Sequence, residues 1–379
     1  MKRLNVILFL LGCGLFVGLV WTIGPKELWH EFLSLGWGLV PFIIFEGVAE
    51  MIHTLGWRHC LMGRARSQSW CYLFRIRMAG YAINYLTPTA ALGGEVTRAT
   101  LLASRCEVSE AAGGVLVGKV CFAFAHLLFV ALGLVVVVRG IKLETVQWVS
   151  LLLAAVLVAC GIGAFLLLQK YGKLGSFIRW LVKRGIGGKP LRRAAAVLTS
   201  VDEQLIAFYR NRPGDLFLAI GWHLVGYSMG IIPTWFFLHS LHPSGTLITA
   251  ATAWILGMGF DLLTFAIPLN AGSLEGSRIL CLKLLGYAPA AGMIYGFAQR
   301  LGQLFWAAAG LVFYATFATD KKRAAASDAP AKNGKNRWAP ATDHESFPHL
   351  SNLHDTNNFT IHKAVDAAVE ELKNPNGSA

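Results

Sequence analysis

The sequence predicts an all-α polytopic membrane protein, in which an inverted repeat contains about six spanning helices and two re-entrant hairpins. The first observation is composition: of 379 residues, 55% are hydrophobic, and the mean hydropathy is +0.52. The second is a set of long apolar runs, because several reach the roughly 20 residues that a spanning helix needs. The third is a polar pattern that occurs once in each half. Together they exclude an ordinary soluble globular protein.

The expected helices follow the apolar runs in chain order. The runs long enough to span a membrane are 4–23, 37–57, 111–138, 147–168, 215–239 and 288–317. Two weaker stretches, 71–92 and 246–267, carry ionisable or amide side chains and run into Pro88 and Pro268. No small-residue cleavage site follows the first run, so we expect it to remain as a helix rather than to be removed as a signal peptide.

The polar pattern connects each weaker stretch to a later apolar run. Residues 88–98 and 268–278 both follow the order Pro-x6-Glu-x2-Arg, with mostly small residues between the Pro and the Glu. In transporters, Gly/Pro-interrupted segments at matching positions of the two halves indicate the binding site. The pattern therefore makes both segments candidate binding elements.

The distribution of positive charge predicts the orientation of the chain. Basic residues gather in 58–77 and 169–212, whereas the loops 24–36, 139–146 and 240–246 carry little positive charge. The positive-inside rule then places the N-terminus and both basic segments in the cytoplasm.

The same rule predicts two re-entrant hairpins. If 71–105 and 246–285 enter the membrane from opposite faces and return, the basic cluster 321–323 also lies in the cytoplasm. A full crossing by 246–267 would put that cluster outside. Non-helical backbone at membrane depth is tolerated only inside protein or along a wet cavity, so the two hairpins should meet in the interior.

The domain organisation follows from where the apolar pattern ends. We expect a membrane domain at 1–319, with repeat halves at about 4–138 and 147–317. The tail, 320–379, is polar and is predicted to be mostly disordered and cytoplasmic. A basic amphipathic stretch at 170–184 is expected to lie on the cytoplasmic lipid surface.

The acidic and basic residues of the repeated pattern have two interpretations. As plain helix starts, Glu95 and Glu275 suit a helix N-terminus, and Arg98 and Arg278 can pair with them three residues later. As a site, a helix N-terminus attracts anions and Arg binds phosphate through two hydrogen bonds. Glycines at 93–94 would let a headgroup or another helix approach the backbone closely. The repetition favours the functional interpretation.

Two cations lie inside the apolar runs that follow the pattern. Lys119 and Arg300 come 24 and 25 residues after Glu95 and Glu275, respectively. An intramembrane cation must face a partner or a cavity, so these glutamates are the expected partners. The alternative is a side chain that extends from a helix end toward the lipid surface.

A polar stripe is predicted on the second apolar run. Glu46, Glu50 and His53 have the spacing of one helix face and should face the cavity, with Arg98 or Lys119 as possible partners. Metal binding or proton relay is the other interpretation, but further metal ligands are not evident. Single polar residues in other runs are expected to make helix–helix hydrogen bonds; they are His126, His223 and Asp261.

Several activities have no support in the sequence. The chain has no P-loop, no Gly-x-Ser-x-Gly, no His-Glu-x-x-His and no dinucleotide fingerprint. Its seven cysteines are scattered singly, so neither a disulfide framework nor a metal site is predicted. We expect no cofactor, no metal, no enzymatic activity and no nucleic-acid partner, and the net charge of +13 is assigned to membrane contact.

The segment from Asn84 to Arg98, taken with its second-half counterpart, resembles the flippase-like membrane domain of lysylphosphatidylglycerol synthases. The resemblance covers about residues 4–317 and implies a polytopic inner-membrane protein that moves a lipid between leaflets. Stand-alone members include a group associated with hopanoid biosynthesis in bacteria. Full-length synthases carry a large soluble aminoacyl-transferase domain, which the polar tail is too short to form. By motif match, the resemblance implies a functional core of Pro88, Gly93, Gly94, Glu95, Arg98, Gly272 and Glu275.

The function expected from these features is transport of a lipid with an anionic headgroup across a bacterial inner membrane, with both termini cytoplasmic. The site would comprise the implied core together with Lys119, Pro268, Arg278 and Arg300. Two alternatives stay open: a membrane-embedded lipid or glycosyl transferase with Glu95 as its base, and a non-transporting partner of lipid-biosynthesis proteins. The sequence does not choose the lipid, the direction, the energy source or the oligomeric state.

Overall fold

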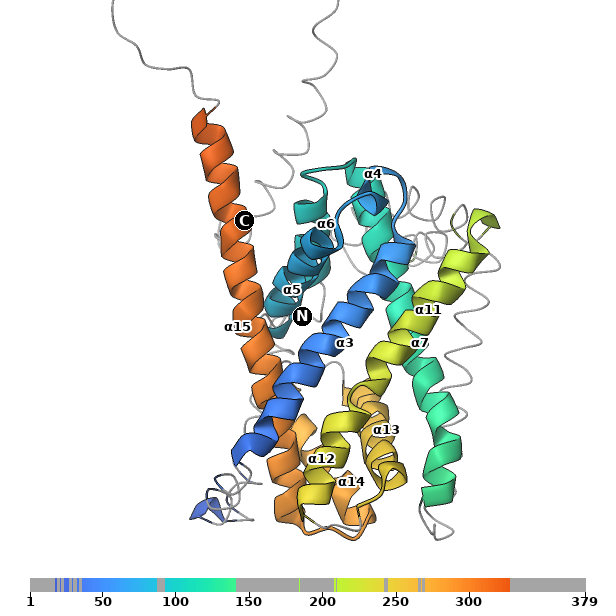
Figure 1. The fold of residues 1–379 in the computed structure, drawn as a ribbon, viewed down its shortest axis with the longest axis vertical. Coiled ribbons are helices and arrows are strands. Elements are labelled where there is room, and N and C mark those ends of the chain that lie inside the picture. The colour runs from blue at the N-terminus through green and yellow to red at the C-terminus, as the bar shows by residue number, and fades with distance from the viewer. Residues whose placement is uncertain are drawn as a thin grey trace, which may run out of the picture. The chain divides into compact units, whose positions relative to one another are not determined.

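A computed structural model describes residues 36–86, 93–140, 210–241, 245–264 and 270–327, together with a few isolated positions (Figure 1). All regular structure in these residues is helical. Several predictions lie outside the described residues apart from isolated positions: the runs 4–23 and 147–168, the basic stretch 170–184, the tail beyond 327, Pro88 and Pro268.

The first half of the chain begins with a short 3₁₀ helix, η1, at Gly36–Leu39. The helices that follow are α3 (Val40–Cys60), α4 (Gly63–Arg66), α5 (Trp70–Leu86), α6 (Gly93–Leu102) and α7 (Val108–Gly140). The second half contains α11 (Pro213–Ser228), α12 (Ile231–Leu241), α13 (Leu247–Thr264), α14 (Ser273–Leu284) and α15 (Pro289–Ser327). A proline in the first turn starts α3, α11 and α15, where its missing N–H costs no helical hydrogen bond.

Four described segments are long and apolar enough to cross a membrane: Gly36–Cys60, Val108–Val138, Pro213–Leu241 and Leu247–Thr264. The first three match the predicted spans 37–57, 111–138 and 215–239. The fourth is α13, which the sequence treats as the start of a re-entrant hairpin, so that hairpin is not confirmed. Helix α15 continues to Ser327, which makes the first residues of the predicted tail helical.

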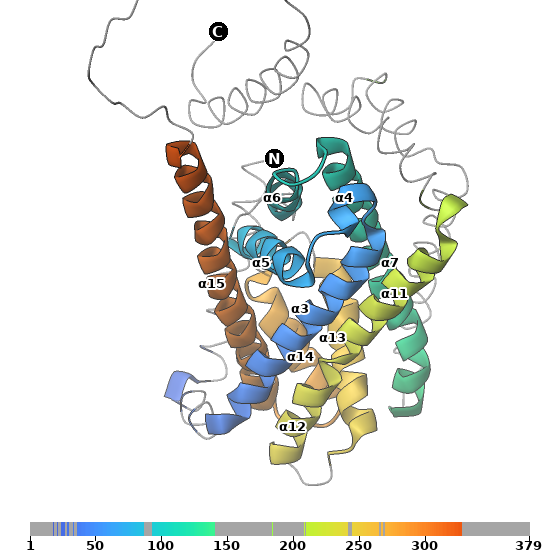
Figure 2. The same ribbon diagram turned by 45° about the horizontal axis from the view of Figure 1, so that its top comes forward.

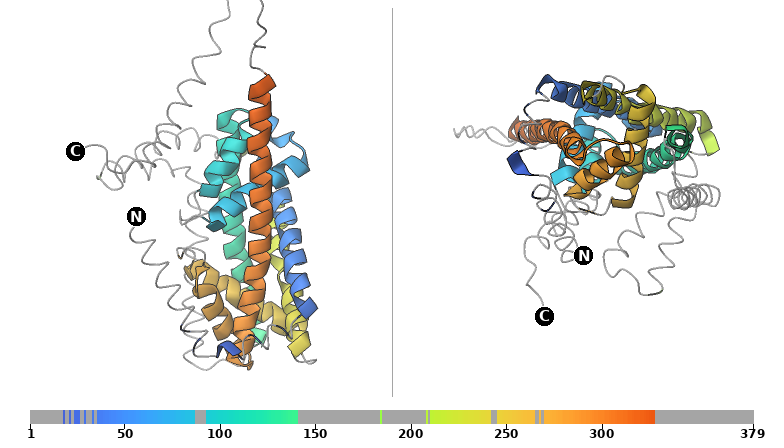
Figure 3. Two further views of the ribbon diagram at one scale, coloured as in Figure 1. Left: turned by 90° about the vertical axis from the view of Figure 1, so that its left-hand side faces the viewer. Right: turned by 90° about the horizontal axis from the view of Figure 1, so that it is seen from below.

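Helices from the two halves pack against each other in the unit formed by Met1–Ala326. Helix α3 lies along α11, and α7 lies against α11 and α13 (Figures 1 and 2). Helix α15 runs beside α3 and α5 (Figure 3): Trp306 donates to the carbonyl of Ile43 at 2.7 Å, and Arg75 donates to Thr316 at 2.7 Å. The two halves therefore share one helical core.

The same order of helices surrounds each of the two polar patterns. Helix α5 precedes a break, then α6 and the long α7; α13 precedes a break, then α14 and the long α15. In each pair the helix before the break packs against the one after it. This order supports an internal repeat, whereas the inverted orientation of its halves stays a prediction.

Candidate functional site

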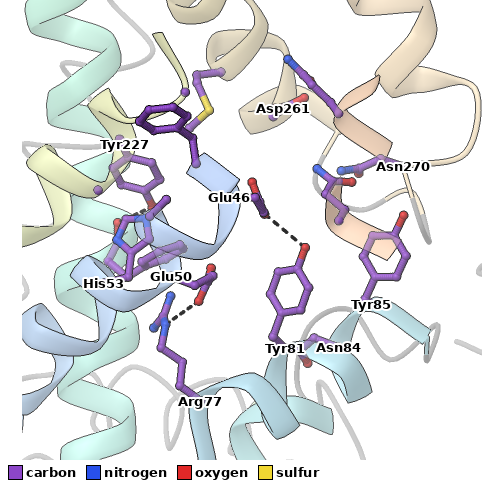
Figure 4. A pocket seen from close by; sticks show the side chains of 18 of the residues that line it. Glu46, Glu50, His53, Arg77, Tyr81, Asn84, Tyr85, Tyr227, Asp261 and Asn270 are labelled. Carbon is purple, nitrogen blue, oxygen red and sulfur yellow. Dashed lines mark hydrogen bonds and ion pairs between the residues drawn. The ribbon is translucent and has the colours of Figure 1, made fainter. Parts of the chain in front are cut away.

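A central cavity of about 440 Å³ lies between the helices of the two halves (Figure 4). Its lining comes from helices α3, α5, α6, α7, α11, α12, α13, α14 and α15 and from the residues just before α14. Among the predicted site residues, those that line it are Glu46, Glu50, His53, Glu95, Arg98, Lys119 and Arg278. Glu275 and Arg300 lie outside the lining and form an ion pair of their own.

The start of α6 is built around Asn84 of α5. The side chain of Asn84 accepts a hydrogen bond from the backbone N–H of Gly94 at 2.6 Å and donates one to Glu95 at 3.0 Å. A Cβ at position 94 would collide with the carbonyl oxygen of Gly80, so the predicted close approach at the paired glycines is a helix–helix contact. The amide of Asn84 therefore fixes both the helix N-terminus and its first carboxylate.

The two predicted cation–carboxylate partnerships are both formed. Lys119 Nζ lies 2.9 Å from Glu95 Oε1. Arg300 donates to Glu275 through Nε at 2.5 Å and through Nη2 at 3.0 Å. Their surroundings differ, because Glu275 is fully buried whereas Lys119 keeps 38% of its side chain exposed. The second-half pair is a closed structural contact, and the first-half pair borders the cavity.

The two arginines of the repeated pattern also differ in their partners. Arg278 is 2% exposed, pairs with Asp261 through two hydrogen bonds of 2.9 and 3.1 Å, and donates to Gln299 at 2.8 Å. Arg98 lies 3.9 Å from Glu95, beyond hydrogen-bond distance, and its Nε has no hydrogen-bond partner among the described residues. Among the described residues, Arg98 is therefore a cavity cation with an unpartnered Nε and no carboxylate within hydrogen-bond distance.

The polar stripe of α3 faces the cavity as predicted, but its partners are different. Arg77, not Arg98 or Lys119, pairs with Glu50 at 2.6 Å, and both side chains are buried. Tyr81 donates to Glu46 at 3.3 Å (Figure 4). Arg77 and Tyr81 lie on α5, which brings the first weaker stretch against α3. In the sequence, only the polar residues of 71–92 indicate this contact, and they do not specify which side chains pair.

The third residue of the stripe, His53, contacts a histidine of the other half. His53 Nδ1 and His223 Nδ1 lie 3.0 Å apart in the buried interface between α3 and α11. His126 makes the helix–helix contact that was expected for the single polar residues, from its Nε2 to the carbonyl of Met258 at 3.1 Å. Nothing in the spacing of His53 and His223 indicated that they pair.

The charged side chains that line the described cavity are equal in number for the two signs. Its carboxylates are Glu46, Glu50, Glu95 and Asp261, and its cations are Arg77, Arg98, Lys119 and Arg278. Three carboxylates pair with Arg77, Lys119 and Arg278. In the residues described, no group of three or more metal-ligating side chains lies close enough to hold a metal. Glu46 and Arg98 are left outside these three pairs, and the arrangement offers an anion contact at Arg98.

Comparison with known proteins agrees with the helical membrane fold. The model of a family described as "Lysylphosphatidylglycerol synthase TM region" matches residues 9–310. A curated "UPF0104 membrane protein" from Methanothermobacter thermautotrophicus is 22% identical over 317 residues, which cover 81% of this chain and 93% of that protein. No solved structure matches the chain.

Proposed function

Because the chain belongs to the lysylphosphatidylglycerol synthase transmembrane-region family, we propose that it is a flippase-like translocator that moves a lipid with an anionic headgroup between membrane leaflets. The observation that carries the proposal is the charged central cavity, lined by residues of both repeated segments. Charged groups inside a membrane protein are costly and mark substrate pathways. A lipid headgroup is a ligand that would use such a cavity at membrane depth.

The anionic part of the headgroup binds at Arg98. The sequence alone suggested that Arg98, Arg278 and Arg300 share this role. The guanidinium groups of Arg278 and Arg300 are already bound to carboxylates, whereas that of Arg98 keeps donors for a phosphate oxygen. Lys119, whose side chain is 38% exposed, lies next to this site in its ion pair with Glu95. Phospholipids and polyprenyl-linked lipids carry such a phosphate, and a link to hopanoid metabolism stays a prediction.

The paired glutamates hold the site rather than react. Glu95 orients Lys119 and the start of α6, and Glu275 fixes α14 to α15 through Arg300. Rocking of one repeat against the other would expose the cavity to each leaflet in turn. We assign no catalysed reaction to the chain and propose a multi-pass inner-membrane location with both termini in the cytoplasm.

Leaflet exchange in liposomes tests this proposal. Purified protein is reconstituted with fluorescent phospholipids of several headgroups, and exchange is followed by chemical quenching of the outer leaflet. Wild-type protein should accelerate exchange of anionic lipids. Arg98→Gln should slow it at least about tenfold, because the phosphate loses its charge-assisted hydrogen bonds.

Arg105→Gln is the matched control. Arg105 is exposed, lies outside the cavity and stacks over the ring of Tyr72 at 4.0 Å, so this variant should transport like the wild type. Equal rates for Arg98→Gln and wild type would exclude Arg98 as the anion contact. Folded wild-type protein that exchanges no lipid would reject the translocator and favour the transferase or the assembly partner.

A further inference from the structure

The histidine contact between the halves has a reciprocal geometry. His53 and Gly56 on α3, like His223 and Gly226 on α11, form a His-x-x-Gly pattern. A Cβ at position 226 would lie 2.5 Å from the ring of His53, and one at position 56 would lie 2.8 Å from the ring of His223. Each imidazole therefore packs on the glycine of the opposite helix, and the two Nδ1 atoms meet at 3.0 Å.

The chemistry of this pair limits how many protons it holds. One ring must donate its Nδ1–H and the other must accept it, so two neutral rings share a single hydrogen between them. One further proton can bind the free Nε2 of the donating ring and leave the hydrogen bond intact. A second one would occupy the accepting nitrogen and break it. The Nε2 of His223, fully buried, has no hydrogen-bond partner among the described residues.

The charges around the pair come from each helix packed against it. The titratable and charged groups facing His53 and His223 are Glu50 of α3, Arg77 of α5, Arg98 of α6, His126 of α7 and Tyr227 of α11. Glu50 is neutralised by Arg77. Arg77 and Arg98 both oppose a proton on the pair, and because Arg77 is held by Glu50, Arg98 is the cation whose charge a bound anion can cancel.

We propose that the His53–His223 pair is a proton-binding site that fills when an anionic headgroup binds at Arg98. This inference rests on the proposed function, since it needs the anion. A bound phosphate cancels the charge of Arg98, and the donating imidazole then takes one proton from the buffer without breaking a covalent bond. Lipid binding and proton uptake are thereby linked, and protons become the coupling ion.

Calorimetric titration tests the linkage. Folded protein in detergent is titrated with a short-chain phosphatidylglycerol, dihexanoyl-phosphatidylglycerol, in two buffers of equal pH and different ionisation enthalpy. The difference in heat gives the protons taken up per lipid bound. Wild-type protein should take up a fraction of a proton per lipid that grows as the pH falls, and its affinity should rise about threefold from pH 7.5 to 6.

Asparagine variants identify the proton acceptor. Asparagine is chosen because its side-chain amide occupies the position of the imidazole Nδ1 and so preserves the contact between the helices. The double variant His53→Asn/His223→Asn should bind the lipid without proton uptake and without the pH dependence. Glu46→Gln, which removes the other weakly partnered acceptor in the cavity, should keep both. Size-exclusion chromatography and the helical circular dichroism signal check that each variant is folded. Unchanged proton uptake in a single His variant supports the pair, because the other imidazole remains.

The outcomes separate the two proposals. Lipid binding with no proton uptake by the wild type overturns the proton site and leaves the lipid site standing. Uptake that persists in the double variant, or that disappears in Glu46→Gln, also overturns it. Failure of the wild type to bind any anionic lipid overturns the proposed function, and the proton linkage with it.

Discussion

Equivalent residues of the repeated pattern have acquired different tasks. Arg98 and Arg278 follow their glutamates at the same spacing, and each lies over a glycine of the preceding helix, Gly80 or Gly257. Only Arg278 has a carboxylate within hydrogen-bond distance, because Asp261 stands on α13. The first half therefore presents its arginine to the cavity, and the second half uses its arginine to hold α13, α14 and α15 together.

This difference predicts unequal effects of the same substitution. Arg278→Gln should lower the free energy of unfolding by about 3–5 kcal/mol, because it leaves Asp261 as an uncompensated charge in a largely buried site. Arg98→Gln should lower it by clearly less, because Glu95 lies beyond hydrogen-bond distance of Arg98 and keeps Lys119 as its partner. Thermal denaturation of both variants in detergent measures the difference. Similar losses of stability would show that Arg98 is as firmly bound as Arg278.

The sequence predicts these residues to different degrees. The spacing of 24 and 25 residues was enough to pair Lys119 and Arg300 with their glutamates, because each pair joins neighbouring helices of one repeat. The partner of Glu50 and the His53–His223 contact could not be predicted. They depend on which helix faces meet across the bundle, and the helix period within one segment does not determine that.

At the scale of elements, the short connection between α6 and α7 has its own electrostatics. Cys106 lies in this connection, outside the candidate spans. Burial, together with the negative charges of Glu110 and Glu107, raises the pKa of the Cys106 thiol to about 11. Only the thiolate attacks a maleimide, so this cysteine should be slow to react at neutral pH.

The corresponding prediction concerns a protein that keeps Cys106 as its single cysteine. Its maleimide labelling rate should rise about tenfold per pH unit from pH 7 and level off near pH 11, since the raised pKa keeps the thiolate scarce below that value. The substitutions Glu107→Gln and Glu110→Gln together should speed labelling at pH 7.5, because they remove two negative charges that oppose the thiolate. A rate that levels off near pH 8.5 would contradict the buried environment of Cys106.

The break between α11 and α12 could not be predicted from the sequence of the span that contains it. The predicted span 215–239 lies in a segment long and apolar enough to cross a membrane, but this segment consists of α11 and α12 with a break at Met229 and Gly230. The side chain of Trp254 lies against Gly230 and donates to the carbonyl of Tyr227 at 2.7 Å. A tryptophan from α13 thus occupies the place of a side chain at 230, a tertiary cause that no pattern inside 215–239 contains.

At the scale of the whole molecule, the sequence predicts a repeat because two similar polar patterns interrupt an apolar chain. The structure adds that the motif arginines lie over glycines and that the His-x-x-Gly patterns interlock. These contacts relate α3 to α11 and α5–α7 to α13–α15. They do not fix the orientation of either half in the membrane. Helix α13 is apolar and long enough to cross the membrane fully, which is the alternative to a re-entrant hairpin.

Cysteine labelling decides that orientation. In a cysteine-free background, single cysteines replace Thr246 before α13, Ala288 after α14 and Thr319 within α15, all of which are exposed positions. If α13 and α14 form a re-entrant hairpin, a membrane-impermeant maleimide added outside intact cells should label positions 246 and 288, and position 319 should react only after the membrane is opened. Labelling of 246 and 319 from outside, with 288 protected, would instead show that α13 crosses fully. That result would remove the inverted repeat, because the two hairpins would no longer enter from opposite faces.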